Sequence, residues 1–415
     1  MSETSSTTDV ESLANEIADS IDPDETIEVL QDLVQIKSPY FEEEDAAEFV
    51  YEWLDEQGLD PEYHHVSEPE ITGFEGDNVI ARLEGDDPDA PTLLFNGHID
   101  TVQIVEEWEE DPLSGRIEDG KLYGQGACDM KGGTVAHMMA FKALAEADVE
   151  WAGDVLLTAV IDEEGPYGLG SDQLIRDGLT DDVDMAIVTE PGPILAQEDV
   201  ENPALLLGAR GRFLYEIDVY GEAAHGSQPH KGTNAVVDAG RVAEALEELD
   251  VGSHPKLGDG SVCPLMVEGG SQTLSVPEHA KVYADRHVVI GETKESVIAD
   301  AEEMVADLDL DSDVDVGVRK APEPDIFYGP YVTDEDHDLV QALTQGTEDV
   351  CDESPAIGYF ASVGDFNYLG HRAELPTVIV GPDGENIHGA GEFVYTDEVV
   401  DVARTIANAA TRLIA

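Results

Sequence analysis

The amino-acid sequence predicts an α/β fold in which helices cover both faces of a sheet, interrupted by a smaller β-α-β-β-α-β unit. Short apolar runs alternate with amphipathic helical stretches along most of the chain, as in α/β proteins. At ~150 residues per domain, the length of 415 residues suits two domains or three. The range 208–320 has an element order of its own. We therefore expect one domain there and a discontinuous domain made of 1–207 and 321–415.

The elements of the larger domain follow from apolar spacing. We expect about the first eight residues to be irregular. Apolar residues recur at helical spacing in 27–34, 46–54 and 133–147, which predicts helices. Short apolar runs predict buried strands at 78–82, 92–96, 155–161, 185–189 and 377–380. The segment IEDGKLY predicts a hairpin that turns at Asp119 and Gly120.

The range 208–320 reads as a ferredoxin-like split unit. Strands are expected at 212–220, 264–267 and 281–289, and a last strand contains the alternating Val314, Val316 and Val318. Helices are expected at 234–249 and 295–308. The residues of the first helix that we expect to face inward are Val237, Val242, Leu246 and Leu249.

The composition is strongly acidic. With 93 acidic and 20 basic residues, the formal net charge is −73, which excludes the basic footprint of a nucleic-acid-binding protein and disfavours docking on anionic membranes. If Tyr is left out of the 41% hydrophobic fraction and Gly is added, the apolar share is about 47%, within the ~45–50% of globular domains. The excess acid must therefore lie on the surface. Because molar salt screens such repulsion, we expect a folded protein from a high-salt cytoplasm.

Other sequence features predict a cytoplasmic protein. Cys128, Cys263 and Cys351 are widely spaced and odd in number, which predicts reduced thiols. The N-terminal residues MSETSSTTDVES lack the basic and apolar regions of a signal peptide. No apolar run approaches the ~18 residues that a membrane span needs.

Polar residues follow several of the predicted strands. His98 and Asp100 follow an apolar strand, and two residues apart on an extended segment they point the same way. His98 could bind a metal while Asp100 orients its ring, although a loop histidine beside a solvated acid is an equal alternative. Asp129 follows a glycine-rich turn and, taken alone, is more typical of an acid at the start of a helix than of a ligand.

Three consecutive acids, Asp162, Glu163 and Glu164, end another apolar strand. In so acidic a chain such a run is usually solvated, but carboxylates at the end of a buried strand repel each other unless a cation lies between them or one is protonated. Glu190 ends a further buried strand, and His388 lies in a loop after the last one.

Taken together, strand ends deliver five candidate ligands and one spare carboxylate, Glu163. The candidate ligands are His98, Asp129, Glu164, Glu190 and His388. Mixed histidine and carboxylate ligands suit zinc, or cobalt and manganese. Five exceed the three protein ligands of a one-metal catalytic site and suit two ions bridged by one carboxylate. The sequence has no phosphate loop, no G-x-S-x-G elbow and no H-E-x-x-H helix.

These residues also carry a family resemblance. The segments that match are GHIDTV, YGQGACDMKGG, DEEG, TEPG, GEAAHGSQPHKGTNAV, ADR and IHGAGEFV, in this order between residues 92 and 394. Together they resemble the co-catalytic zinc aminoacylase and carboxypeptidase family that includes acetylornithine deacetylase and succinyl-diaminopimelate desuccinylase. The resemblance implies a zinc-peptidase-like catalytic domain interrupted by a lid that also mediates dimerisation.

The resemblance also implies a role for each matched residue. His98 and Glu190 would hold one ion, Glu164 and His388 the other, and Asp129 would bridge them. Asp100 would support His98, and Glu163 would be the general base. In the lid, His225 would stabilise the oxyanion in a partner subunit's site, while Asn234 and Arg286 would bind the substrate carboxylate. Relatives often have arginine at Gln125 and asparagine at Leu274, so the exact substrate is left open.

The function that this resemblance implies is hydrolysis of the amide bond of N-acyl amino acids by a water activated by two divalent ions, zinc or else cobalt or manganese. A dipeptidase or carboxypeptidase is the alternative within the family. A non-catalytic metal-binding or assembly protein is the alternative from another class, which the presence of Glu163 disfavours. A homodimer through the lid is expected, since the edges of such a sheet invite pairing. No nucleic-acid or membrane partner is expected.

Overall fold

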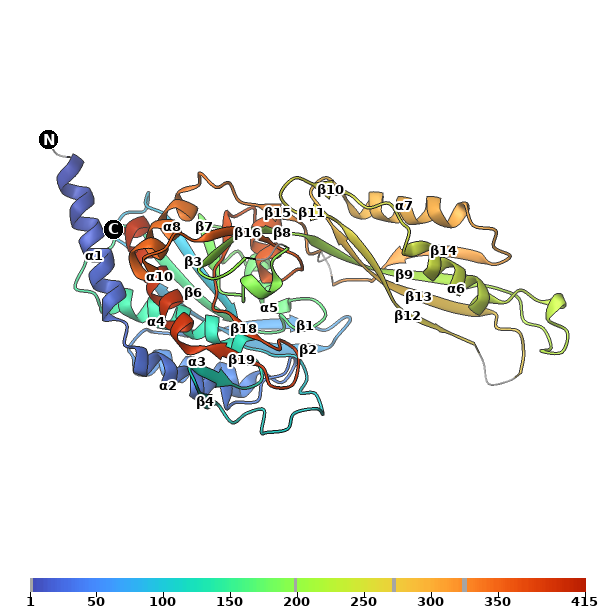
Figure 1. Cartoon of the computed structure of the whole chain (residues 1–415), viewed down its shortest axis with the longest axis horizontal. Coiled ribbons are helices and arrows are strands. Elements are labelled where there is room, and N and C mark those ends of the chain that lie inside the picture. Colours follow the sequence, from blue (N-terminus) through green and yellow to red (C-terminus); the bar gives the residue numbers. More distant parts are fainter. Residues whose placement is uncertain (1–2, 198–199, 271–273, 323–326) are drawn as a thin grey trace. The chain divides into compact units, whose positions relative to one another are not determined.

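The computed structural model of the chain describes residues 3–197, 200–270, 274–322 and 327–415 (Figure 1). It divides into two units, one made of Met1–Ala209 and Val332–Ala415 and the other of Arg210–Tyr331. The second unit runs past residue 320, where the sequence placed its end. The reason is that the chain returns to its first strand, where the backbone N–H of Arg212 donates to the carbonyl of Tyr328 and Phe213 stacks on Phe327.

The first unit is built on a mixed sheet with the strand order β1-β2-β6-β3-β7-β17-β8-β15, and β16 pairs with β8. Strands β6, β3, β7 and β17 run parallel to one another, whereas β2 pairs with β6 and β8 pairs with β17 in antiparallel orientation. The strands are β1 (Glu62–Glu68), β2 (Phe74–Leu83), β3 (Thr92–His98), β6 (Asp154–Val160), β7 (Met185–Val188), β8 (Ala204–Ala209), β15 (Tyr331–Val332), β16 (Ala356–Phe360) and β17 (Thr377–Ile379).

Helices cover both faces of this sheet, as the sequence predicts. Every residue of β3 and β7 is buried, which requires cover on both sides and explains why these strands read as continuous apolar runs. Helix α10 packs against α1, α4 and α8 (Figure 1). The helices are α1 (Glu3–Ser20), α2 (Pro23–Val34), α3 (Glu44–Glu56), α4 (Gly132–Glu146), α5 (Leu169–Arg176), α8 (Asp338–Cys351), α9 (Asp365–Asn367) and α10 (Thr396–Ile414).

Helix α1 contradicts the expectation of an irregular N-terminus. It begins at Glu3, within the stretch expected to be irregular. Its buried residues include Ala14, Ile17 and Ala18, and it packs against α10. Packing on a helix from the other end of the chain therefore stabilises this helix, and a local sequence pattern does not reveal such packing.

A small second sheet joins two distant parts of the first unit. Its strand order is β18-β19-β5-β4, and its strands are β4 (Arg116–Glu118), β5 (Lys121–Tyr123), β18 (Gly384–Glu385) and β19 (Phe393–Tyr395). The predicted hairpin is confirmed: β4 and β5 pair, and the turn residues Asp119 and Gly120 have φ of 52° and 75°. Pairing of β5 with β19 brings the loop after residue 385 to the segment after residue 123.

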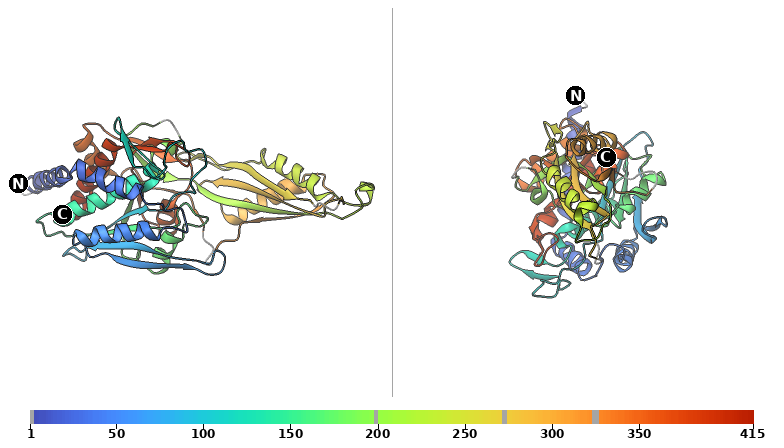
Figure 2. Two further views of the ribbon diagram at one scale, coloured as in Figure 1. Left: turned by 90° about the horizontal axis from the view of Figure 1, so that it is seen from below. Right: turned by 90° about the vertical axis from the view of Figure 1, so that its right-hand side faces the viewer.

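The second unit has the predicted ferredoxin-like topology. Its sheet has the order β12-β13-β9-β14 with all neighbours antiparallel, and α6 and α7 lie against the strands (Figures 1 and 2). The elements are β9 (Gly211–Tyr220), α6 (Ala235–Leu246), β10 (Ser253–His254), β11 (Gly258–Asp259), β12 (Ser261–Gly269), β13 (His279–Val288), α7 (Lys294–Ala306) and β14 (Asp313–Val318).

One inward-facing residue of α6 was predicted wrongly. Val242 and Leu246 are buried and Leu249 packs against the same core, but Val237 is 50% exposed. The helix begins at Ala235, which together with Ala239 and Val242 defines its buried face. Val237 lies off that stripe because two residues advance a helix by about 200°.

The acidic surface leads to a prediction about salt. The net charge of −73 makes the folded state repel itself in dilute buffer, where the Debye length is ~10 Å at 0.1 M, and ~1 M salt shortens that length to ~3 Å. We expect the melting temperature to rise steeply between 0.1 and ~2 M KCl, as measured by circular dichroism. An equimolar series of a neutral osmolyte is the control. A melting temperature that ignores KCl would contradict the high-salt interpretation.

Among the described residues, no helix combines the length and the apolar character that crossing a bilayer requires.

Candidate metal centre

The candidate site lies at the carboxyl ends of the parallel strands of the first unit. His98 is the last residue of β3, Glu163 and Glu164 follow β6, and Glu190 follows β7. Because β3 runs parallel to both β6 and β7, these ends meet at one edge of the sheet. The sequence predicted this part of the site from strand ends alone.

Asp129 and His388 reach the site from segments next to the small second sheet. Asp129 lies in a π-helical turn, η1 (Ala127–Lys131), between β5 and α4. His388 lies in the loop between β18 and β19, with a positive φ of 61°. Both residues are therefore positioned by the small sheet. Asp129 follows the expected glycine-rich turn and precedes α4, and His388 lies in a loop after β17, as the sequence predicts.

Asp129 lies between the two imidazoles. Nε2 of His98 is 3.3 Å from Oδ1 of Asp129, and Nε2 of His388 is 3.2 Å from its Oδ2. Each imidazole also faces a second carboxylate. The distance from His98 Nε2 to Glu190 Oε1 is 3.4 Å, and the distance from His388 Nε2 to Glu164 Oε1 is 2.9 Å. One carboxylate thus joins two histidine–carboxylate pairs.

The donor set fits divalent metal ions. Within the described part of the chain, Nε2 of buried His98 has no hydrogen-bond partner, although carboxylate oxygens surround it. Bonds of ~2.0–2.1 Å to a tetrahedral zinc ion put ligand atoms about 3.3 Å apart, close to the separations around His98. Two groups of three residues each bring their ligand atoms within 4.8 Å of one another. One group is His98, Asp129 and Glu164, and the other is His98, Glu163 and Glu190.

Electrostatics also favours cations here. Burial, together with the charge of Asp129, raises the pKa of Glu190 to about 8 and that of Glu164 to about 7. Burial, with Glu190 next in weight, raises the pKa of Glu163 well above its usual range. Burial opposes ionisation of Asp129, but its contacts with His388 and His98 hold its pKa below the usual range. Cations would let these crowded carboxylates ionise together.

Asp100 orients the ring of His98 by contacting Nδ1, the nitrogen on the side away from the other candidate ligands. It is fully buried, and Nδ1 of His98 lies 3.1 Å from its backbone oxygen and 3.4 Å from its Oδ1. A proton on Nδ1 leaves Nε2 as the basic nitrogen, which is the form that binds metals. The carboxylate of Asp100 also accepts the backbone N–H groups of Glu163 and Glu164, at 3.2 and 2.9 Å. One acid therefore positions the turns of two strands.

Glu163 lies beside the candidate ligands but farther from an imidazole. Its Oε2 is 3.8 Å from Nε2 of His98. The turn that carries it is tight: Asp162 has φ of 61°, and a Cβ at Gly165 would lie 1.7 Å from Oδ1 of Asp162. This turn therefore needs glycine at its end.

A cavity of about 500 Å³ opens over the candidate ligands within the first unit. It is lined by Asp129, Glu163, Glu164, Glu190 and His388 together with Ile194, Leu195, Phe360, Ser362, Val363, Asn386 and Ile387. Its size and its mixture of apolar and acidic lining suit a small organic molecule.

Sequence reasoning missed two acids that hold the site. The carboxylate of buried Glu392 accepts the backbone N–H groups of Gly126, Cys128 and Asp129. Buried Glu43 accepts the backbone N–H of Asp162 at 3.1 Å. Glu392 belongs to a matched segment, IHGAGEFV, whereas nothing in the sequence around Glu43 distinguishes it from the many surface acids.

The second unit carries the other three residues implied by the resemblance. His225 is exposed, and its Nδ1 accepts the backbone N–H of Ser227 at 3.2 Å, which leaves the ring proton on Nε2. Asn234 caps α6 by accepting the N–H groups of two residues in its first turn. Arg286 is 1% exposed and pairs with Glu292.

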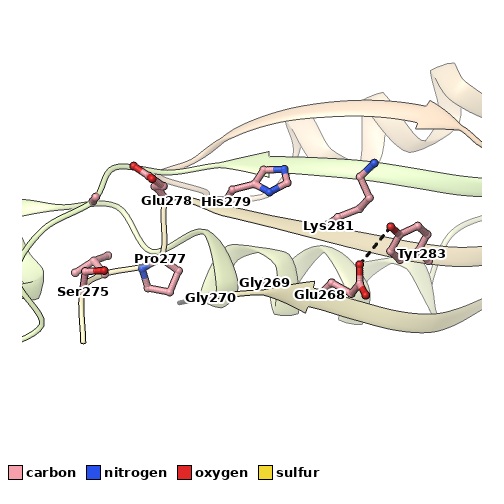
Figure 3. A pocket seen from close by; sticks show the side chains of 11 residues that line it. Glu268, Gly269, Gly270, Ser275, Pro277, Glu278, His279, Lys281 and Tyr283 are labelled. Carbon is pink, nitrogen blue, oxygen red and sulfur yellow. Dashed lines mark hydrogen bonds between the residues drawn. The ribbon is translucent and has the colours of Figure 1, made fainter. Parts of the chain in front are cut away.

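A separate hollow of about 450 Å³ lies in the second unit (Figure 3). Lys281 and Tyr283 of β13 line it, and the hydroxyl of Tyr283 donates to Glu268 at 3.4 Å (Figure 3). Ser275 at its rim pairs with His225 in an isolated β-bridge. Among the described residues, both clusters of metal-ligating atoms lie in the first unit, so the metal chemistry is assigned there.

Comparison with known proteins agrees with the motifs. The model of peptidase family M20/M25/M40 matches residues 94–412. The chain is 29% identical over 365 residues to an N-formyl-4-amino-5-aminomethyl-2-methylpyrimidine deformylase of Bacillus subtilis, covering 80% of this chain and 82% of that protein. It is 25% identical over 411 residues to a probable succinyl-diaminopimelate desuccinylase of Staphylococcus epidermidis, covering 89% and 93%.

Solved structures agree with the fold. Aminopeptidase PepT of Bacillus cereus has a TM-score of 0.74 at 20% identity, covering 95% of this chain and 99% of that one. The YXEP protein of Bacillus subtilis, a dinuclear metal-binding peptidase, has a TM-score of 0.69 at 16% identity, covering 94% and 98%. The family inferred from the motifs is thereby confirmed. The protein belongs to peptidase family M20/M25/M40 and is a hydrolase of that family.

Proposed function

We propose that this enzyme hydrolyses the amide bond of N-acyl amino acids with two divalent metal ions, zinc first among them. The observation that carries the proposal is the position of Asp129, whose two carboxylate oxygens each face a different histidine. His98 and Glu190 would hold one ion and His388 and Glu164 the other, with Asp129 shared. When bound, the ions would lower the pKa of a water molecule and polarise the scissile carbonyl.

Glu163 is the proposed general base. It takes the proton of the attacking water and returns it to the leaving nitrogen. Its Oε2 lies 3.8 Å from His98 Nε2, farther than the 3.3 and 3.4 Å of Asp129 and Glu190, which supports this separate role. Asp100 keeps Glu163 in position through the backbone N–H of that residue.

The second unit is the proposed lid and dimerisation domain. His225 presents Nε2–H as a donor for the oxyanion of the partner subunit's substrate. The support within this unit is the bond from Ser227, which fixes the donor at the outer nitrogen. Asn234 stays a candidate for the substrate carboxylate through its amide nitrogen, since its oxygen is used by the helix cap. Arg286 would need to leave Glu292 to take part.

N-acetyl and N-succinyl amino acids are the proposed substrates. A named relative that is a probable desuccinylase and one that is a deformylase both act on acylated nitrogen, which supports a deacylase. A dipeptidase or carboxypeptidase is the alternative within the same chemistry. The chain retains Glu163 beside the ligand set, which disfavours a non-catalytic metal-binding or assembly protein.

A substrate screen tests the proposal. The purified protein, in molar KCl with Zn²⁺ or Co²⁺, is offered N-acetyl, N-formyl and N-succinyl amino acids and dipeptides, and the released amine is measured. We expect hydrolysis of acyl amino acids that a chelator abolishes and added metal restores. Faster cleavage of dipeptides would favour the peptidase alternative. Bound metal without hydrolysis of any amide would favour the non-catalytic one.

A further inference from the structure

Glu392 makes an unusual set of contacts just before β19. Its side chain is fully buried, and its Oε2 accepts the N–H of Gly126 at 2.8 Å. Its Oε1 accepts the N–H groups of Cys128 and Asp129 at 3.0 and 3.1 Å. Its own backbone carbonyl accepts the N–H of Gly124 at 3.0 Å. One residue therefore accepts four backbone hydrogen bonds from the segment that ends at Asp129.

The shape of that segment explains why an anion is needed there. Gly126 is left-handed, with φ of 74°, and it precedes the π-helical turn η1. N–H groups on either side of a left-handed residue converge into a concavity that binds anions. The carboxylate of Glu392 occupies this concavity and accepts the N–H groups of Gly126 and Cys128. The turn that presents Asp129 thus depends on a side chain far away in the sequence.

Glu392 also belongs to the loop that carries His388. This loop lies between β18 and β19, so its end is fixed where β19 pairs with β5. The same loop therefore supplies one proposed ligand and holds the backbone of another. The result is the 3.2 Å separation between His388 Nε2 and Asp129 Oδ2.

We propose that Glu392 is a positioning residue of the metal centre, which sets the bridging carboxylate of Asp129 between the two ions and keeps it in register with His388. The inference rests on the proposed two-ion site. The site formed by Asp129, Glu164 and His388 depends on Glu392 through two of its ligands, whereas the site formed by His98 and Glu190 depends on it only through Asp129. Loss of Glu392 should therefore lower the metal affinity of the site with His388 more than that of the site with His98.

A matched acid in the same unit separates positioning from general stability. Glu68 is 3% exposed, and its carboxylate accepts the backbone N–H groups of Glu70, Ile71 and Thr72 at the end of β1. It resembles Glu392 in burial and in accepting three backbone N–H groups. None of its partners is a proposed ligand.

The experiment compares Glu392→Gln with Glu68→Gln in the full chain. Glutamine keeps the size but puts an N–H₂ group where one carboxylate oxygen accepted a bond. The metal-free proteins are titrated with Zn²⁺ by calorimetry, and the spectrum of the Co²⁺-loaded proteins and the metal-free melting temperature are recorded. Glu392→Asp, which keeps the charge, is the second variant in case the first does not fold.

We expect the wild type to bind two ions. In Glu392→Gln, the affinity for one of the two ions should fall by about 10- to 100-fold, and the Co²⁺ spectrum should change. Glu68→Gln should bind both ions as the wild type does, even where its melting temperature falls as much. Unchanged affinity for both ions in a folded Glu392 variant would overturn the inference while leaving the proposed function intact. An equal loss of metal affinity in Glu392→Gln and Glu68→Gln would also overturn the inference. A wild type that binds no ions would overturn the proposed function itself.

Discussion

Replacing Glu163 with glutamine should lower turnover by about 10²-fold or more while the bound metal stays nearly constant. Glutamine fills the same space, but its amide cannot take a proton from the attacking water. Glu163 lies beside the ligand set at 3.8 Å from His98 Nε2, so the proposed ligands remain in place when it changes. The measurements are kcat on the substrate found in the screen and metal content by mass spectrometry.

The neighbouring acid provides the matched control. Glu164→Gln makes the same chemical change one residue later, but Glu164 faces Nε2 of His388 at 2.9 Å and is a proposed ligand. We expect this variant to lose metal, with activity partly restored by excess Zn²⁺. If Glu163→Gln instead strips the metal and Glu164→Gln keeps it, the two roles are reversed.

Mixing two nearly inactive variants should restore activity if His225 acts across a dimer. A His225→Ala chain keeps Glu163, and a Glu163→Gln chain keeps His225. In a mixed dimer, one site combines Glu163 of its own chain with His225 of the partner. We expect each variant alone to be nearly inactive and the mixture, after subunit exchange, to recover up to about one intact site per mixed dimer.

The oligomeric state decides how the result is interpreted. Light scattering shows whether the protein is a dimer, and differently tagged chains show whether mixed dimers form. The control takes each variant alone through the same subunit-exchange procedure. Proven mixed dimers without recovery would mean that His225 acts within its own chain or has no part in catalysis. A strictly monomeric protein would exclude the trans role.

Most of the fold was predictable from local patterns. The buried parallel strands, such as β3, are short apolar runs because both of their faces are covered. The hairpin of β4 and β5 was predictable because Asp119 and Gly120 suit a turn with positive φ. The helix α1 was not, because its stability comes from packing on α10 at the other end of the chain.

The candidate site was predictable where a ligand follows a strand of the main sheet. His98, Glu164 and Glu190 follow from that rule, since parallel strands end at one edge. The route of Asp129 was not predictable, because it depends on pairing between β5 and β19, which are far apart in the sequence. The supporting roles of Glu392 and Glu43 were hidden for the same reason: their partners are backbone N–H groups of remote turns.

The interrupted layout of the first unit has a consequence for the order of events during protein synthesis. Strand β17 lies between β7 and β8, and α10 packs on α1, α4 and α8, yet β17 and α10 are made only after the whole second unit. A nascent chain that ends with the second unit already contains every proposed ligand except His388. It lacks the strand that fills the gap in the sheet and the acid that holds Asp129. The proposed metal centre therefore cannot be completed until the part of the chain beyond the second unit, with β17, His388 and Glu392, has been synthesised.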